Sequence, residues 1–147
     1  MNKCYIASGW FSPEWLQELE NIKSILDSHG LTYFSPRDEA ICEADASIDR
    51  QKAIFDGNIR GLEVSDWMIC NTRNKDMGSV WEAGAFYEMK KPIVYFAGGL
   101  PEGAQFNLML AQSGKAVCMN LEELDDYLAR CVEAGELLVE EYGGRIE

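Results

Sequence analysis

Short apolar runs alternate along the chain with longer segments in which apolar residues recur at helical spacing. Strand-like runs occupy residues 3–7, 31–34, 66–70, 92–97 and 115–119. The segments between and after them repeat apolar residues three and four positions apart, which is typical of amphipathic helices. Because a crossover between parallel strands requires a helix, this alternation predicts an α/β fold with a mainly parallel sheet.

Several helix ends are marked by capping and breaking residues. Ser12 followed by Pro13 predicts the start of the first helix, and Gly30 marks its end. Residues 38–49 are acidic and lack a clear period, so we expect a loop that contains at most a short helical piece. Helical spacing returns from Ile48 to Leu62, and residues 121–139 are predicted to form one or two amphipathic helices.

Helices on both faces of a parallel sheet, joined by right-handed crossovers, favour a flavodoxin-like, doubly wound fold. We therefore predict a five-stranded sheet of order 2-1-3-4-5 in a single domain over residues 1–147. In this order a ligand binds between strands 1 and 3, beyond their carboxyl ends. The loops there are residues 8–13 and 71–78, and the second leads into a helix start with two carboxylates, Asp76 and Glu82.

Glu82 admits two interpretations. Ser79 and Glu82 have the S-x-x-E spacing of a capping box, in which the glutamate side chain bonds the backbone at the helix start. Glu82 also shares a helical stripe with Phe86 and Met89, on the side expected to be buried. A carboxylate on the buried side of a helix needs a specific reason, so a functional role stands beside the capping role.

The net charge of −12 and the pI near 4.5 argue against a nucleic-acid polymer as partner. Such binding depends on basic side chains that neutralise phosphates. The five cysteines are scattered without C-x-x-C spacing and are expected to be reduced core residues. No signal peptide and no apolar stretch of about 18 residues is found, so we expect a cytoplasmic protein with no membrane partner.

Common cofactor and metal chemistries lack their residues here. The chain has neither the G-x-G-x-x-G of dinucleotide binding nor a phosphate-binding P-loop. Its only histidine, His29, is expected at a helix end, and no cluster of histidines and cysteines offers metal ligands. We expect no cofactor and no metal, which leaves Asp76 and Glu82 as the candidate chemistry. Two carboxylates in different environments can act as nucleophile and proton shuttle, as in glycosyl transfer.

Four short blocks of the sequence carry a family resemblance. They are residues 5–12 (YIASGWFS), 34–37 (FSPR), 76–84 (DMGSVWEAG) with Lys91 and Pro92, and 107–109 (NLM). In their order, and in the six-residue separation of Asp76 from Glu82, the chain resembles the nucleoside 2-deoxyribosyltransferase family. Members of this family exchange the base of a 2′-deoxynucleoside for another base through a covalent deoxyribosyl-enzyme intermediate. The resemblance covers most of the chain and implies a 2′-deoxynucleoside and a free nucleobase as substrates.

The resemblance also implies roles for individual residues. Glu82 would be the nucleophile that attacks C1′, Asp76 would contact the nucleobase and handle its proton, and Tyr5 would hydrogen-bond and orient Glu82. A fixed donor fits this role because it keeps a nucleophile in its near-attack position. Asn107 would reach the sugar 5′-hydroxyl in a neighbouring subunit's site, with Met109 packing beside the nucleophile, so a homo-oligomer is implied. From composition alone, Tyr5 is an ordinary strand aromatic.

Base recognition is assigned to two loops by the same resemblance. Gly9, Trp10 and Phe11 would line the base pocket, where aromatic faces stack on planar bases. Arg37 and Asp38 would supply contacts to the base edge. Without the resemblance, the two aromatic residues would be core or interface residues and Arg37 a solvated charge.

Asn58 departs from the family pattern. Many members carry an aspartate at this position, where it helps to bind the base. Asn58 offers both a donor and an acceptor, so the base preference stays open while the nucleophilic step is unaffected.

Two alternatives to the transferase remain. One is an N-glycoside hydrolase of the same fold that acts on nucleosides or nucleoside 5′-monophosphates. Phosphate-recognising relatives tend to carry serine where Asn107 stands, so this residue favours a free 5′-hydroxyl. The other is a nucleoside-binding module without turnover, against which the presence of Asp76, Glu82 and Tyr5 argues.

Overall fold

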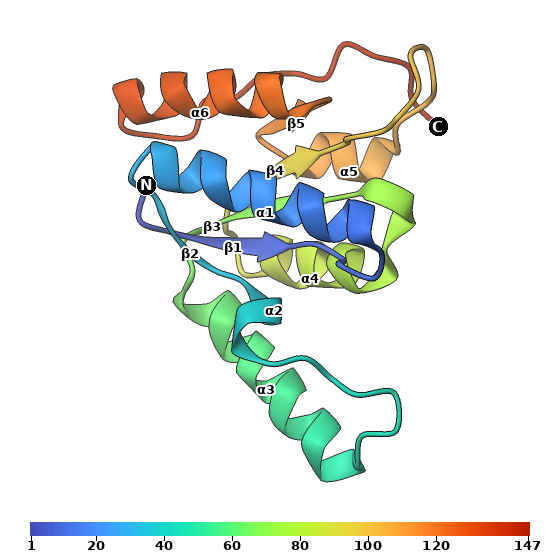
Figure 1. Cartoon of the computed structure of the whole chain (residues 1–147). Coiled ribbons are helices and arrows are strands. Elements are labelled where there is room, and N and C mark those ends of the chain that lie inside the picture. The colour runs from blue at the N-terminus through green and yellow to red at the C-terminus, as the bar shows by residue number, and fades with distance from the viewer.

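Five parallel strands form the centre of the computed structural model, which describes residues 1–147 (Figure 1). The strands are β1 (Lys3–Ala7), β2 (Thr32–Phe34), β3 (Trp67–Asn71), β4 (Ile93–Phe96) and β5 (Ala116–Cys118). They are hydrogen-bonded in the order β2-β1-β3-β4-β5, and every pair is parallel. The predicted flavodoxin-like order 2-1-3-4-5 is confirmed.

Helices connect the strands as the hydrophobic pattern predicts. They are α1 (Pro13–Ser28), α2 (Pro36–Glu39), α3 (Ile48–Val64), α4 (Met77–Glu88), α5 (Leu108–Ser113) and α6 (Leu121–Ala134), with a short 3₁₀ turn η1 (Arg73–Lys75) before α4. The Ser12 side chain caps α1 by accepting from the Trp15 N–H, and Pro13 is its first residue. His29 lies at the end of α1, as predicted.

Two buried clusters lie on opposite faces of the sheet. One packs α1 and α6 against the strands, and the other packs α3, α4 and α5. Alternation along β1 divides its side chains, so that Cys4 and Ile6 belong to the first cluster and Tyr5 and Ala7 to the second. Tyr5 therefore lies on the same face of the sheet as α4, the helix that carries Glu82.

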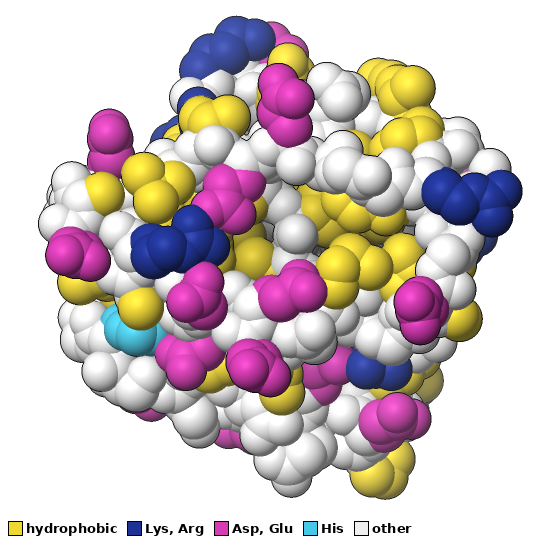
Figure 2. Space-filling view, turned by 90° about the horizontal axis from the view of Figure 1, so that it is seen from above, with side chains coloured by type: hydrophobic (Ala, Val, Ile, Leu, Met, Phe, Trp, Pro, Cys, Tyr) yellow, Lys and Arg dark blue, Asp and Glu magenta, His cyan; other side chains and the backbone are white.

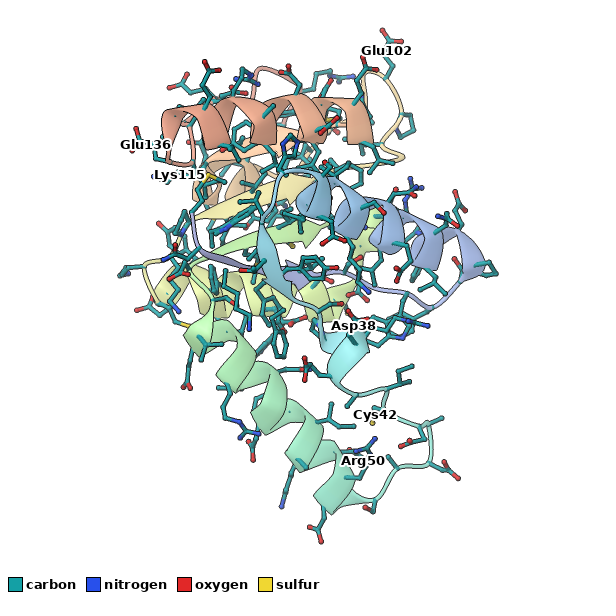
Figure 3. All side chains as sticks on the ribbon, turned by 60° about the vertical axis from the view of Figure 1, so that its left-hand side comes forward. Asp38, Cys42, Arg50, Glu102, Lys115 and Glu136 are labelled. Atoms are coloured by element: carbon teal, nitrogen blue, oxygen red, sulfur yellow. The ribbon has the colours of Figure 1, made fainter.

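The amino-terminal part of α3 extends away from the body of the molecule (Figure 1). Arg50 on this arm and Cys42 in the loop that precedes it lie far from the sheet, as Figure 3 shows. The other end of α3 is held by Lys91, whose Nζ donates to the backbone carbonyls of residues 62, 63 and 65 at 2.9, 2.6 and 2.7 Å. Helix ends leave such carbonyls without intrahelical partners, so one ammonium group both satisfies them and fixes the base of the arm.

Two predicted boundaries are corrected by the structure. The helix predicted over residues 121–139 ends at Ala134, because Gly135 adopts a left-handed conformation (φ 77°) that closes the helix. The chain then returns along the sheet edge, where Glu140 N–H bonds the Lys115 carbonyl and Ile146 pairs with Phe106. The predicted loop over residues 38–49 contains the end of α2 and the start of α3.

The cysteines are all free, and four of them are buried. Cys42 is exposed, so the expectation of core cysteines is wrong at this position. None of the helices has the length and apolar character needed to cross a membrane. On the face shown in Figure 2, acidic side chains outnumber basic ones around a hollow where hydrophobic side chains gather, in keeping with the net charge of −12.

Candidate functional site

Asp76 caps the amino terminus of α4. Its Oδ2 atom accepts hydrogen bonds from the Ser79 N–H at 2.9 Å and from the Ser79 hydroxyl at 2.6 Å. The helix begins at Met77, so Ser79 is already inside the first turn and is buried. The capping-box interpretation of Ser79 and Glu82 is therefore wrong, and Glu82 is free of any duty at the helix start.

Glu82 is held by Tyr5 from the centre of the sheet. Tyr5 is completely buried, and its hydroxyl donates a hydrogen bond to Glu82 Oε2. The pKa of Glu82 is raised to about 7, mainly by burial; the Tyr5 hydrogen bond opposes this rise and the charge of Asp76 adds to it. Burial and the adjacent Glu82 charge raise the pKa of Tyr5, so the phenol remains a donor. The structure thus places the Tyr5 hydroxyl in contact with Glu82 and the charge of Asp76 close enough to raise the pKa of Glu82.

The Tyr5 ring is itself held in place. It stacks on Phe34 of β2, with ring centroids 5.3 Å apart and an interplanar angle of 15°. Offset stacking of this kind fixes the orientation of the ring plane as well as the burial of the ring. Since Tyr5 and Phe34 are register partners on neighbouring strands, the sheet determines where the hydroxyl points.

A cavity of about 380 Å³ opens beside Glu82, between α3 and α4. Its lining residues are Phe55, Asn58, Ile59, Leu62, Gly78, Trp81 and Glu82. Asn58 and Glu82 are among the predicted site residues, whereas the aromatic pair Phe55 and Trp81, whose ring centroids lie 5.7 Å apart, is not. A signal for Phe55 exists in its helical spacing with Asn58 and Leu62, which places the three residues on one side of α3.

The loop after β1 approaches the site from the other side. A side-chain carbon at Gly9 would lie 3.4 Å from Asp76 Cγ, so the backbone of this loop packs directly on the capping carboxylate. Phe11 is 68% exposed, and its ring lies 5.1 Å from that of Trp10. Trp10 packs against the cluster under α1, so neither aromatic lines the cavity that contains Glu82.

Arg37 and Asp38 also lie outside that cavity. Asp38 Oδ1 accepts a hydrogen bond from Lys23 Nζ at 2.7 Å, which ties α2 to α1. The Nε atom of Arg37 is buried and has no partner. The structure therefore commits the carboxylate of Asp38 to Lys23 and leaves a donor of Arg37 unused.

Asn107 and Met109 lie at the start of α5, away from the Glu82 of their own chain. The Asn107 side chain caps α5 by accepting from the Leu110 N–H at 3.2 Å. Met109 is 72% exposed and borders an apolar groove of about 290 Å³ between α4 and α5, together with Val80 and Tyr87. Within one chain, these two residues do not contribute to the cavity beside Glu82.

Other candidate sites are poorer in chemistry. A larger cavity, about 610 Å³, lies between residues 100–104 and 140–145 and contains none of the predicted site residues. No group of three or more histidine, cysteine or acidic side chains is arranged to hold a metal ion. The one place where a shifted carboxylate pKa, a buried hydroxyl donor and a cavity coincide is Glu82.

Comparison with known proteins identifies similar solved structures. Among solved structures, the chain is similar to a 2-deoxyribosyltransferase from the psychrotolerant bacterium Bacillus psychrosaccharolyticus. The TM-score is 0.76 and the identity 28%, over 95% of this chain and 98% of that chain. A search of curated proteins finds no significant match.

More distant structures share the fold. A conserved protein from Enterococcus faecalis V583 has a TM-score of 0.73 at 18% identity, over 88% of this chain and 98% of that chain. A CMP N-glycosidase of Clostridium botulinum has a TM-score of 0.55 at 13% identity, over 88% of this chain and 99% of that chain. At these identities the likeness shows the fold alone.

The family model of nucleoside 2-deoxyribosyltransferases matches residues 4–121. The matched range contains β1 with Tyr5, the loop after it, and α4 with its cap. The protein therefore belongs to the nucleoside 2-deoxyribosyltransferase family.

Proposed function

We propose that the protein exchanges the nucleobase of 2′-deoxynucleosides through a covalent deoxyribosyl intermediate on Glu82. The observation that carries this proposal is the hydrogen bond from the buried Tyr5 hydroxyl to Glu82, beside an open cavity. An unpaired carboxylate could rotate away from the substrate, whereas one held by a fixed donor stays in a near-attack position. The similarity to a 2-deoxyribosyltransferase supports the same activity.

Each half of the exchange moves one bond and one proton. Glu82 attacks C1′, the N-glycosidic bond breaks, and its electron pair leaves with the base, which takes a proton through Asp76. The incoming base then attacks C1′ and gives its proton back through Asp76, and the ester bond to Glu82 breaks. Glu82 ends as the carboxylate with which it began, so the cycle needs no cofactor.

The environment of Glu82 suits both halves. Burial raises its pKa to about 7, which makes the carboxylate a better nucleophile than an exposed glutamate. The Tyr5 hydrogen bond lowers the pKa and also supports departure of Glu82 as a leaving group in the second half. Deprotonated Glu82 is the form that attacks.

Base recognition in this proposal uses both sides of the site. Asn58 lines the cavity with Glu82 and offers one donor and one acceptor to a base edge. The close approach of Gly9 to Asp76 supports a role for the loop with Trp10 and Phe11 on the other side. We further propose that Arg37 contributes its unused Nε and that Asp38 acts with it through Lys23.

The sugar site is proposed to need a second copy of the chain. Asn107 would contact the 5′-hydroxyl in the neighbouring site, and Met109 would pack beside the neighbouring Glu82. Exposed apolar side chains on α4 and α5, among them Tyr87 and Met109, support burial of this surface in a homo-oligomer. A single domain over residues 1–147 is part of the same proposal.

The test is chromatography of thymidine incubated with adenine. The proposal predicts deoxyadenosine and free thymine together, and only slow hydrolysis when adenine is omitted. Release of thymine without a new nucleoside would identify a hydrolase instead.

Glu82→Gln and trapping of the adduct test the mechanism. The variant should lose base exchange, and mass spectrometry of the wild-type protein quenched with substrate should locate a deoxyribosyl group on Glu82. Base exchange near the wild-type rate in Glu82→Gln would show that the nucleophile is another residue.

A further inference from the structure

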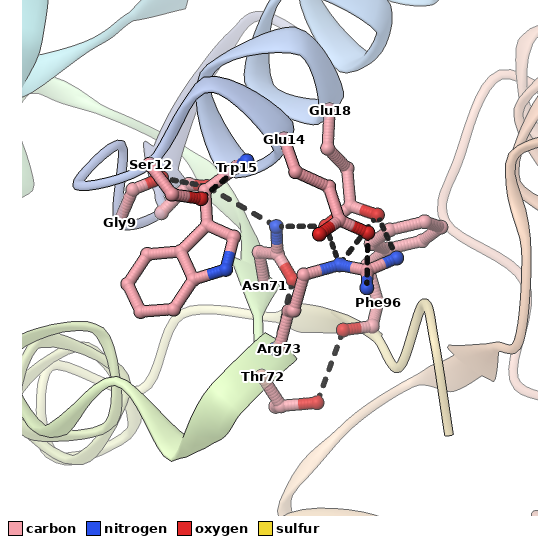
Figure 4. Close-up of polar contacts among 10 residues, drawn as sticks. Gly9, Ser12, Glu14, Trp15, Glu18, Asn71, Thr72, Arg73 and Phe96 are labelled. Atoms are coloured by element: carbon pink, nitrogen blue, oxygen red, sulfur yellow. Dashed lines mark hydrogen bonds and ion pairs between the residues drawn. The ribbon is translucent and has the colours of Figure 1, made fainter. Parts of the chain in front are cut away.

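A network of buried and partly buried polar side chains lies at the carboxyl ends of the central strands, beside the turn that leads to Asp76 (Figure 4). Its centre is an ion pair in which Arg73 Nε donates to both oxygens of Glu18 at 2.7 and 2.9 Å, and Nη2 donates to Oε2 at 2.6 Å. The Asn71 amide donates to Glu18 Oε1 at 2.8 Å and to Ser8 Oγ at 3.2 Å. Protein donors therefore engage both oxygens of Glu18.

The network does not share the cavity with Glu82. Glu18 is 8% exposed, and neither it nor Arg73 lines that cavity. A separate hollow of about 380 Å³ borders the pair on the side of α6, and neither Asp76 nor Glu82 lines it. A side-chain carbon at Gly99 would overlap the Arg73 guanidinium, so the turn after β4 is shaped around this group. The influence of the pair on the reaction is therefore indirect.

The backbone next to Arg73 is bound to two strands. The Arg73 N–H donates to Asn71 Oδ1 at 3.0 Å. The N–H and the hydroxyl of Thr72 both donate to the Phe96 carbonyl, at 2.9 and 3.1 Å. The start of the turn is thus fixed to β3 and β4, and the guanidinium adds a fixed point on α1 through Glu18.

The turn then adopts a rare conformation before it delivers Asp76. Asn74 and Lys75 have φ values of 56° and 55°, and two successive left-handed residues other than glycine are unusual. Such a conformation persists only when neighbouring contacts hold it. Besides the Thr72 bonds to Phe96 and a bond from the Lys75 N–H to the Thr72 carbonyl at 3.0 Å, the side-chain contacts that hold it are the Arg73 anchor at one end and the Asp76–Ser79 cap at the other.

We propose that Arg73, held by Glu18, is a positioning residue that sets the place of Asp76 relative to Glu82. The inference rests on the proposed function, in which Asp76 moves the proton of the base across from the nucleophile. The Glu18 carboxylate is buried and Arg73 is partly exposed. A buried charge that is paired in this way is seldom more stable than apolar residues of the same shape, so geometry is a better reason for this pair than stability. The anchor acts without touching the substrate.

The experiment compares Arg73→Met with Arg130→Met. Methionine keeps the aliphatic stem and removes the guanidinium. Arg73 pairs with Glu18 and, at 3.6 Å, with the exposed Glu14. Arg130 is the matched control because it too pairs with two carboxylates, Asp126 and Glu140, but on the exposed side of α6. Glu18→Gln is the second variant, since it removes the charge of the anchor with little change of shape.

Three quantities are measured: the pKa of the Glu82 carboxyl by carbon NMR without substrate, the amide exchange rate of Ser79, and kcat and KM for base exchange. The charge of Asp76 raises the pKa of Glu82, so a displaced Asp76 should lower it from its value of about 7. Ser79 amide exchange should become faster because its acceptor has moved. We expect kcat to fall by about 10- to 100-fold, more than KM rises, and Arg130→Met to change none of the three.

A folded Arg73→Met or Glu18→Gln protein with wild-type titration of Glu82 and wild-type exchange at Ser79 would overturn the inference. If Arg73→Met does not fold, the same measurements on Glu18→Gln decide it. Absence of base exchange in the wild-type protein, together with the expected shifts in pKa and amide exchange, would reject the proposed function and leave the positioning role standing.

Discussion

The ring of Phe34 lies directly against Gly61 of α3. A side-chain carbon at Gly61 would come within 2.5 Å of the Phe34 ring, which is closer than two carbon atoms pack without displacement. The opposite face of the same ring stacks on Tyr5. Gly61 therefore gives Phe34 the space in which it supports Tyr5, and through Tyr5 the carboxylate of Glu82.

We expect Gly61→Ala to reduce both stability and base exchange. Alanine is the better helix former, but here its methyl group would push Phe34 toward Tyr5, at a cost of about 1–3 kcal/mol. Gly57→Ala is the matched control in the same helix, because its nearest side-chain neighbour, Arg60, is 3.9 Å away. That variant should be stabilised by about 0.5–1 kcal/mol. Urea unfolding measures the stability of both variants, and equal effects at the two positions would contradict the contact between Gly61 and Phe34. The double variant Gly61→Ala with Phe34→Leu should recover stability.

Tyr5→Phe keeps the ring and removes the donor. Because the Tyr5 hydrogen bond lowers the pKa of Glu82, its loss should raise that pKa above about 7. Base exchange should fall by about 10- to 100-fold through loss of orientation. The pH dependence of kcat/KM measures the shift, and an unchanged acidic limb with full activity would show that Tyr5 is only a core residue.

The pH dependence of stability follows from the same carboxyl group. Folding raises the pKa of Glu82 from 4.5 to about 7, so in this range the folded chain binds a proton that the unfolded chain has released. Stability should therefore fall as the pH rises through this window, by about 3 kcal/mol. The free energies of unfolding of the wild type and of Glu82→Gln are measured at several pH values across the window. The contribution of Glu82 is the change with pH in the difference between the two free energies. Activity should rise over the same range because the attacking form is the carboxylate.

The three hydrogen bonds from Lys91 Nζ to the end of α3, here called the Lys91 clamp, should contribute to stability. Lys91→Met leaves the carbonyls of residues 62, 63 and 65 without their donor and should cost about 2 kcal/mol. Lys90→Met is the control, since Lys90 is exposed and lies 3.8 Å from its only carboxylate, Glu88. It should change stability by less than about 0.5 kcal/mol. Comparable losses in the two variants would show that the clamp contributes little.

Features of the fold and the site that depend on local sequence pattern could be predicted, whereas features that depend on contacts between distant residues could not. The strand order followed from the alternation of runs and helices, because connection rules leave few topologies. The cap of α4 did not follow, since Asp76 with Ser79 and Ser79 with Glu82 both fit capping spacings. The choice is made by the turn at residues 73–75, whose start is held by the bonds from Thr72 to Phe96 and from Arg73 to Glu18, both partners being distant in sequence.

The cavity walls were hidden for a similar reason. Phe55 has the helical spacing of a core residue, yet it is half-exposed because α3 leaves the sheet beyond the contact of Gly61 with Phe34. The tilt of a helix depends on its anchors, here Gly61 and Lys91, and neither is visible in a hydrophobic period. The end of α6 is a different case. Glycine commonly ends helices, so Gly135 indicated the end, but the amphipathic spacing that continues to residue 139 favoured a longer helical segment.

Subunit complementation tests the proposed contribution of Asn107. If each site joins Glu82 of one chain to Asn107 of its neighbour, Glu82→Gln and Asn107→Ala should each be inactive alone. In a randomly mixed oligomer, a site is intact when its own chain is the Asn107→Ala chain and its neighbour is the Glu82→Gln chain. That combination occurs at about one quarter of the sites whatever the size of the oligomer, so mixing by unfolding and refolding together should restore about a quarter of the wild-type rate. A mixture as inactive as its two components would show that Asn107 serves the site of its own chain, or none.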